Sequence, residues 1–166
     1  RAQQEMTEVE RVARHALAEV RAAVTGMRRS DLASEIISAR LMLEASGVSF
    51  DSELPEGSAL PPAVEAPLAL VLREAVTNIH RHARASAASV RFVHDKASFQ
   101  MHISDNGCGG LAAHGNGVSG MRERVRAMGG SLEIDSPKRR GTCLRIEVPL
   151  ARLAHVAPAS LPENAA

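Results

Sequence analysis

The feature that most restricts the fold is a glycine-rich segment from Asp105 to Gly120, which contains six glycines. Before it, residues Ser98 to Ser104 alternate between apolar and polar side chains, a pattern that predicts a half-buried strand. After it, apolar residues recur at helical spacing until Gly129 and Gly130. Free backbone N–H groups at the start of such a helix attract anions, and the helix dipole adds to that attraction. The segment therefore predicts a site where a strand, a loop and a helix hold a phosphate group.

The rest of the chain predicts an α/β two-layer sandwich, in which a mixed β-sheet is covered by helices on one face. The reason is that consecutive predicted strands are joined by short turns, while helices separate the pairs. The expected elements lie at residues 6–27, 30–47, 48–50, 62–84, 89–94, 98–104, 121–128, 132–134 and 144–148. Ser30 or Asp31 caps the second helix, with Glu35 placed as in a capping box.

The N-terminal residues 1–29 predict a separate long helix with a coiled-coil seam. Its apolar or small residues follow one another at steps of three and four: Met6, Val9, Ala13, Ala16, Val20, Ala23 and Met27. One helix cannot bury this face alone, so it needs a partner. We expect a homodimeric helical bundle, and the alternative is that the helix packs against its own domain. Residues 30–150 then form the main domain, and residues 151–166 form a disordered tail.

Composition excludes several classes of function. Lys and Arg number 20 and Asp and Glu 19, so a net charge of +1 gives no field that would attract nucleic acid or an anionic membrane. Aromatic residues make up 2%, so any nucleotide pocket must be aliphatic and polar. No apolar run approaches the roughly 18 residues that span a bilayer. We expect no nucleic-acid partner and no membrane contact by this chain, which we interpret as a segment of a longer protein.

Three polar side chains lie at four-residue steps on the long predicted helix: Glu74, Asn78 and His82. This spacing places them on one helix face beside the apolar stripe. A carboxamide oxygen suits Mg²⁺ when phosphate oxygens and water fill most of its shell, so Asn78 is a candidate ligand. Glu74 can orient a water or a nucleophile, while Arg81 and His82 can meet phosphate. Taken alone, these residues fit solvated helix positions better than a site.

Asp105 stands at the end of a strand, where its carboxylate can accept a hydrogen bond from an exocyclic amine such as that of adenine. By itself, the Asp-Asn-Gly sequence fits a hairpin turn better. Residues 115–120 match G-x-G-x-x-G, and Asp135 ends the next strand, as a dinucleotide-binding unit requires. In that fold the first glycine follows its strand at once, whereas ten residues separate Ser104 from Gly115. We interpret the match as coincidental and the inserted residues as a lid.

Other catalytic motifs are missing from the sequence. It contains neither the G-x-x-x-x-G-K-[ST] phosphate loop nor the G-x-S-x-G nucleophile elbow. Cys108 has no paired base in the sequence, so we interpret it as incidental. His80 and His82 have no further ligands at zinc spacing.

Taken in order, the motifs resemble the ATP-binding domain of sensor histidine kinases, of the GHKL ATPase superfamily, over nearly the whole chain. The matching segments are an N box at residues 73–83, glycine boxes at residues 105–110 and 115–125, and Gly141-Thr142 before the last strand. The sequence Gly-Met-Arg-Glu-Arg-Val at residues 120–125 and the short lid resemble the DesK-type, NarL-partnered subfamily. Residues 1–29 resemble the second helix of the dimerisation hairpin of that family.

The resemblance implies a role for each matching residue. Asn78 would bind Mg²⁺, and Glu74 would position water or the catalytic groups. Asp105 would accept the adenine amino group, with Thr142 helping through water. The other implied ATP-binding residues are Arg81 and His82 beside the phosphates, Gly107 and Gly109 near the base, Gly115, Gly117 and Gly120 at the lid and helix start, and Met121 as the floor of the pocket.

Two departures from the pattern of the family stand out. Arg81 replaces the more usual lysine, which keeps the charge but changes the geometry. Residues 137–140, Pro-Lys-Arg-Arg, replace a Pro-Gly turn. We interpret these residues as a solvated turn.

The function implied is phosphoryl transfer from Mg-ATP to a histidine, for relay to the receiver domain of a response regulator. The sequence lacks the His-Asp type of acceptor motif, so we interpret His15 as a packing or surface residue and expect the acceptor upstream. The implied partners are ATP, a second copy of the chain and a response regulator. The implied location is the cytoplasmic portion of a membrane-bound kinase. The alternatives are a non-catalytic nucleotide-binding or dimerisation module and another GHKL-type ATPase or protein serine kinase.

Overall fold

The computed structural model describes residues 31–53, 60–112 and 114–151. The helix predicted at residues 6–27, with His15, and the tail predicted beyond residue 151 lie outside the described residues. In chain order the elements are α2 (Leu32–Ala45), β1 (Ser49–Ser52), α3 (Pro62–Asn78), the π-helical turn η1 (Ile79–Ala83), β2 (Ala87–His94), β3 (Ser98–Asp105), α4 (Asn116–Ala127), β4 (Ser131–Asp135) and β5 (Thr142–Pro149). None of the helices in these ranges is long and apolar enough to cross a membrane.

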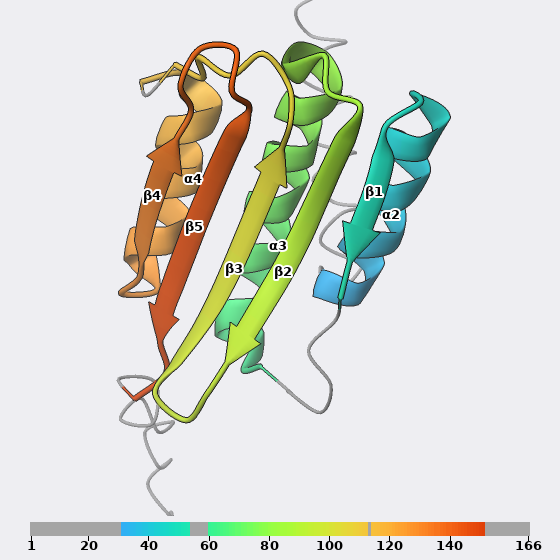
Figure 1. Ribbon diagram of the computed structural model, residues 1–166. Helices are drawn as coiled ribbons and strands as arrows, with labels where there is room; N and C mark the ends of the chain where they lie inside the picture. The colour runs from blue at the N-terminus through green and yellow to red at the C-terminus, as the bar shows by residue number, and fades with distance from the viewer. Residues whose placement is uncertain (1–30, 54–59, 113, 152–166) are drawn as a thin grey trace, which may run out of the picture.

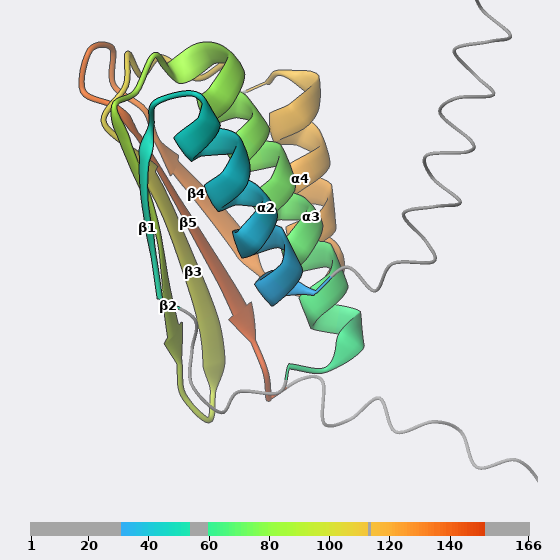
Figure 2. The ribbon, with the colours of Figure 1, turned by 90° about the vertical axis from the view of Figure 1, so that its right-hand side faces the viewer.

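The five strands form one mixed sheet in the order β1-β2-β3-β5-β4 (Figure 1). Strand β1 runs parallel to β2, and all other neighbouring strands are antiparallel. Helices α2, α3 and α4 lie side by side over one face of the sheet (Figure 2). The predicted two-layer α/β sandwich is therefore confirmed. A dinucleotide-binding fold would need a parallel sheet with helices on both faces, which this topology excludes.

The core lies between the helices and the covered face of the sheet. Strand β3 alternates as predicted, because Phe99, Met101 and Ile103 are at most 2% exposed while the side chains between them are half-buried on the other face. From the helix layer, α3 adds Leu68 and Leu72, which are fully buried. The strand places every second side chain, and the helix every third or fourth, on one face. The apolar faces of β3 and α3 therefore meet in the core.

Helix α2 begins as predicted but uses its acidic residue differently. Asp31 is the N-cap, and its Oδ1 accepts a hydrogen bond of 2.7 Å from the N–H of Ser34. The expected capping box is wrong, because the carboxylate of Glu35 faces α3. There it accepts hydrogen bonds of 3.1 and 3.2 Å from Nε of Arg73, and Nη2 of Arg73 also donates to it. The pair joins α2 to α3 beside the core.

Two helix ends determine where the site can form. Helix α3 continues beyond Asn78 as the turn η1 and stops at Arg84, whose φ of 50° is left-handed. The helix after the glycine-rich segment begins at Asn116, five residues before the predicted start at Met121. Gly117 and Gly120 therefore lie inside α4 rather than in the loop, because Gly115 takes the N-cap position.

We expect Glu35→Ala to lower the free energy of unfolding by about 1–3 kcal/mol, because it leaves Arg73 without its partner at a half-buried position. The matched control is Glu44→Ala, which removes an exposed pair with Arg40 within the same helix. This control should change the free energy of unfolding by no more than about 0.5 kcal/mol. Chemical denaturation measures both values, and equal losses in the two variants would contradict the structural role of the pair.

Candidate functional site

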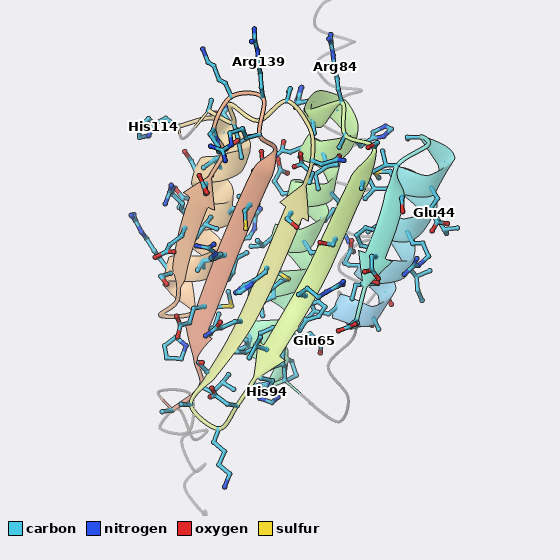
Figure 3. The ribbon with its side chains drawn as sticks, in the orientation of Figure 1. Glu44, Glu65, Arg84, His94, His114 and Arg139 are labelled. Carbon is cyan, nitrogen blue, oxygen red and sulfur yellow. The ribbon has the colours of Figure 1, made fainter. Side chains whose placement is uncertain are left out.

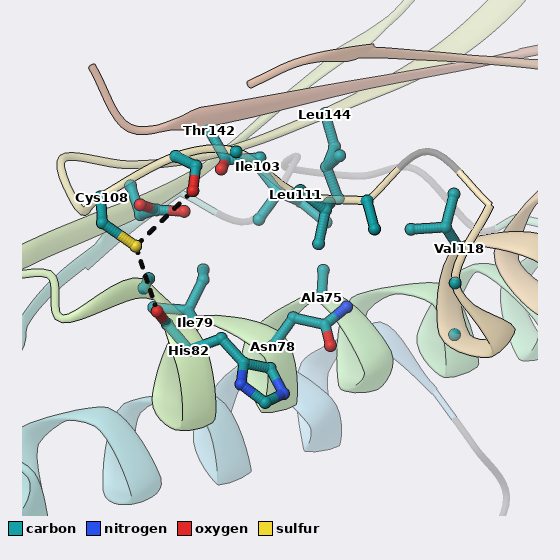
Figure 4. A pocket seen from close by; sticks show the side chains of 17 residues that line it. Ala75, Asn78, Ile79, His82, Ile103, Cys108, Leu111, Val118, Thr142 and Leu144 are labelled. Carbon is teal, nitrogen blue, oxygen red and sulfur yellow. Dashed lines mark hydrogen bonds between the residues drawn. The ribbon is translucent and has the colours of Figure 1, made fainter. Parts of the chain in front are cut away.

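A pocket of about 380 Å³ opens where β3 ends and β5 begins, between α3 and the start of α4 (Figure 4). Its lining comes from segments far apart in the sequence that the fold brings together. The residues are Ala75, Asn78, Ile79, His82, Ala83, Ile103, Asp105, Cys108, Gly109, Gly110, Leu111, Ala112, Gly115, Gly117, Val118, Thr142 and Leu144. The wall is mainly aliphatic with a few polar groups, as the low aromatic content predicted.

Asp105 is the acidic group of the pocket. Strand pairing places it directly opposite Thr142, because Asp105 ends β3 and Thr142 begins β5. Its Oδ1 accepts a hydrogen bond of 2.8 Å from the N–H of Gly107. Burial raises the pKa of Asp105, while the N–H groups of Gly107 and Thr142 act in the opposite direction. The carboxylate is therefore a strong acceptor held at an apolar wall.

Some of the predicted site residues of the N box line the pocket and others lie outside it. Asn78 and His82 line the pocket from the end of α3 and from η1 (Figure 4). Glu74 does not line it, because its carboxylate lies against the first turn of α4, where a Cβ on Gly117 would overlap its Oε1. A carboxylate at a helix N-terminus is favoured by the helix dipole. Arg81 is exposed and outside the lining residues.

Three other predicted site residues lie outside the lining of the pocket. Met121 is a residue of α4 and is fully buried in the core. Gly120 lies on α4 next to Arg124. Gly107 packs against the backbone carbonyl of Ala83, which a Cβ at this position would overlap. Of the predicted glycines, Gly109, Gly115 and Gly117 line the pocket.

Backbone hydrogen bonds fix the first glycine box in place. The N–H of Cys108 donates to the carbonyl of Ala83 at 2.7 Å, and the N–H of Gly141 donates to the carbonyl of Gly107 at 2.9 Å. The N–H of Arg139 donates to the carbonyl of Cys108 at 2.6 Å. The side chains of residues 137–140 are exposed, as expected of a solvated turn, and Arg139 projects with Arg84 from this end of the molecule (Figure 3). The turn at residues 137–140 therefore contacts the first glycine box through its backbone.

The sequence did not reveal the aliphatic lining or the place of Cys108. Ile103 and Leu144 face each other across β3 and β5 and carry the apolar wall up to Asp105 and Thr142. Strand alternation could have identified both as pocket residues, had the pairing of β3 with β5 been known. Cys108, interpreted as incidental, lines the pocket with its thiol 3.2 Å from the carbonyl oxygen of His82.

The polar groups of the pocket fit a magnesium ion that arrives with phosphate. Within residues 31–53, 60–112 and 114–151, no group of three or more His, Cys, Asp or Glu side chains is placed to hold a metal. Asn78 offers a neutral amide oxygen at the pocket wall. Mg²⁺ commonly takes one or two protein ligands and fills its shell with water and phosphate oxygens. The site therefore fits Mg²⁺ bound together with a nucleotide.

The one-sided α/β sandwich, with an aliphatic pocket at the end of its central strand β3, fits a nucleotide-binding domain. Comparison with known proteins gives the family. Residues 63–152 match the family described as Histidine kinase-, DNA gyrase B-, and HSP90-like ATPase. The chain belongs to this family, and the resemblance noted in the sequence is confirmed.

Similar curated proteins are sensor histidine kinases. The sensor histidine kinase YxjM of Bacillus subtilis is 36% identical over 146 residues, which cover 84% of this chain and 36% of that protein. The sensor histidine kinase DesK of Bacillus subtilis is 33% identical over 155 residues, covering 89% of this chain and 41% of that protein. This chain thus spans about two fifths of the length of these relatives. These likenesses support an ATP-binding catalytic domain of a kinase.

Solved structures share the fold at low sequence identity. The histidine kinase domain of the blue-light activated histidine kinase EL346 from Erythrobacter litoralis superposes with a TM-score of 0.62 and 20% identity, covering 70% of this chain and 58% of that one. The mycobacterial sensor histidine kinase MprB gives a TM-score of 0.55 and 18% identity, covering 72% and 94%. The architecture is therefore that of histidine kinase ATPase domains.

The raised pKa of Asp105 predicts the sign of a pH effect on stability. The folded state keeps a proton on this carboxyl at pH values where the unfolded state has lost it, so this contribution to the free energy of unfolding falls as pH rises through that window above 3.8. Denaturation of the wild type and of Asp105→Asn from about pH 4 to about pH 7 measures the difference. We expect the stability of the wild type relative to the variant to fall with rising pH, and a rise would contradict the assignment.

Asp95 provides a control of opposite sign. Its pKa is lowered, because its carboxylate accepts backbone hydrogen bonds from Ser98 and Ala97 in the β2–β3 turn. Its contribution is therefore present above the unfolded pKa and lost as pH falls through the folded pKa. The stability of the wild type relative to Asp95→Asn should rise with pH.

Proposed function

We propose that this chain is the Mg-ATP-binding catalytic domain of a two-component sensor histidine kinase. It transfers the γ-phosphoryl group of ATP to a histidine supplied from outside this sequence, for relay to the receiver domain of a response regulator. The observation that carries the proposal is a single pocket with Asp105 at one end and Asn78 on the wall formed by α3. The names of the similar curated proteins support the same function.

The adenine ring would occupy the end of the pocket near Asp105. There the carboxylate can accept a hydrogen bond from the exocyclic amine, and the hydroxyl of Thr142 lies on the neighbouring strand. Ile79, Ile103 and Leu144 offer apolar surface to the faces of the ring. A cavity of this size and lining is typical of a small-molecule site.

The phosphates would point toward Asn78, His82 and the start of α4. The dipole of α4 favours an anion at its start, which the carboxylate of Glu74 also approaches from α3. Asn78 would hold Mg²⁺, which neutralises charge on the transferred group when it is bound. Glu74, against the first turn of α4, would position that helix or a water. Arg81 is exposed between Ile79 and His82, which line the pocket, and would meet phosphate from outside.

We further propose the remaining arrangement implied by the resemblance. Residues 1–29 form the second helix of a dimerisation hairpin and join two copies, residues 30–150 form the catalytic domain, and residues 151–166 form a tail. The chain then works in the cytoplasm as part of a sensor kinase. A non-catalytic nucleotide-binding module, another ATPase of the superfamily and a protein serine kinase would use the same pocket, so only the fate of the phosphoryl group distinguishes them.

Calorimetric titration with a non-hydrolysable ATP analogue, with and without Mg²⁺, tests the proposed pocket. Asp105→Ala should weaken binding by about tenfold to a hundredfold, because it removes a charged hydrogen-bond acceptor. Asn78→Ala should remove the dependence of binding on Mg²⁺. The control is Asp95→Ala, whose exposed carboxylate lies in the β2–β3 turn and should leave affinity unchanged. Binding of NAD in place of ATP, or of neither by the folded protein, would overturn the proposal.

A further inference from the structure

Ser136 lies just outside the pocket and contacts three of the residues that line it. It follows β4 and precedes the exposed turn at residues 137–140. Its Oγ is 2.7 Å from Oγ1 of Thr142 and accepts a hydrogen bond of 2.9 Å from the N–H of Leu111. Its carbonyl accepts a further hydrogen bond of 2.9 Å from the N–H of Gly110. Ser136 therefore connects Gly110 and Leu111 of the glycine-rich segment to the hydroxyl of Thr142.

Either hydroxyl can donate in this contact, so its direction decides where the second proton points. A serine hydroxyl has one proton to donate and two lone pairs that accept. The N–H of Leu111 already occupies one lone pair of Ser136. Among the described residues, Oγ1 of Thr142 is the acceptor within reach of the Ser136 proton. When Ser136 donates to Thr142, the proton of Thr142 is left to point elsewhere. This direction is part of the proposal below.

Thr142 stands beside Asp105, the acidic group of the pocket. Asp105 and Thr142 are directly paired across β3 and β5, and both line the cavity. When Ser136 donates to Thr142, the carboxylate accepts and the threonine hydroxyl donates, so the two groups form an acceptor–donor pair. Adenine presents the complementary edge, with its N6 amine as a donor and ring N1 as an acceptor. Guanine presents the reverse, because O6 accepts and N1–H donates.

We propose that Ser136 is a positioning residue that orients the hydroxyl of Thr142 as a donor into the pocket and so contributes to the selection of adenine over guanine nucleotides. This inference rests on the proposed function, because it assumes that the pocket takes a purine nucleotide. It assigns to Ser136 a role that the glycine boxes and the N box do not contain. The role is exerted through Thr142, directly or through a water that Thr142 orients.

The test compares the dissociation constants of ATP and GTP for the full chain and three variants. Ser136→Ala should weaken ATP binding by about threefold to tenfold, the range of one neutral hydrogen bond, and lower the preference for ATP over GTP by a similar factor. Ser136→Thr keeps the hydroxyl and should restore both values. Ser89→Ala is the matched control, because it removes a similar hydroxyl contact, 2.9 Å to Ser104, outside the residues that line the pocket. It should change neither value.

A double-mutant cycle separates positioning from a general loss of structure. In the background of Thr142→Val, Ser136→Ala should have no further effect on the preference for ATP over GTP, because Ser136 acts through the missing hydroxyl. An equal effect in both backgrounds would overturn the proposal. Circular dichroism checks folding, and Ser136→Cys, with its weak donor, replaces Ser136→Ala if the latter does not fold.

Different results would contradict the role of Ser136 and the proposed ATP pocket. If the wild type binds ATP but Ser136→Ala keeps both the affinity and the preference, the role of Ser136 is wrong and the ATP pocket stands. If the folded wild type binds neither nucleotide, the proposed function fails and this inference fails with it.

Discussion

The site depends on the close approach of two backbone segments, the end of η1 and the first glycine box. A side chain at Gly107 would overlap the carbonyl of Ala83, and the N–H of Cys108 donates to that same carbonyl at 2.7 Å. Gly141 closes the other side, because its N–H donates to the carbonyl of Gly107 and a Cβ there would overlap the carbonyl of Asp105. The end of α3 and the ends of β3 and β5 are thereby held around one cavity.

This arrangement explains how a pocket without aromatic residues can recognise a base. The apolar side chains of β3, β5 and α3 face one another between the sheet and the helices. Those nearest the pocket, Ile103, Leu144 and Ala75, form part of its wall. The polar groups follow where the strands end, so that Asp105 and Thr142 stand next to each other at the edge of the apolar surface. Burial makes each hydrogen bond there more selective, because a ligand that cannot satisfy the carboxylate leaves it unpaired.

Much of the fold could be predicted from periodicity and turn residues, and the pocket only in part. Strand alternation in residues 98–104 and the glycines at residues 129–130 correctly predicted β3 and the end of α4. Glu35 was misplaced, because a capping pattern is local while its true partner, Arg73, lies on another helix. The start of α4 was misplaced, because glycines disfavour a helix by propensity alone but Gly117 leaves room for Glu74. Ser136 was missed, because it belongs to no motif and its contacts with Leu111 and Thr142 are made only in the fold.

The most direct measurement of the central claim is the chemical form of the phosphate that the chain transfers. The protein is incubated with γ-labelled ATP and Mg²⁺ together with a separately prepared acceptor-histidine helical hairpin of a sensor histidine kinase. We expect label on the hairpin that is lost in acid and stable in alkali, as is typical of phosphohistidine. We expect none on His15 and none when Asn78→Ala replaces the wild type. Acid-stable label on serine, or release of phosphate without any transfer while ATP binds, would contradict a histidine kinase.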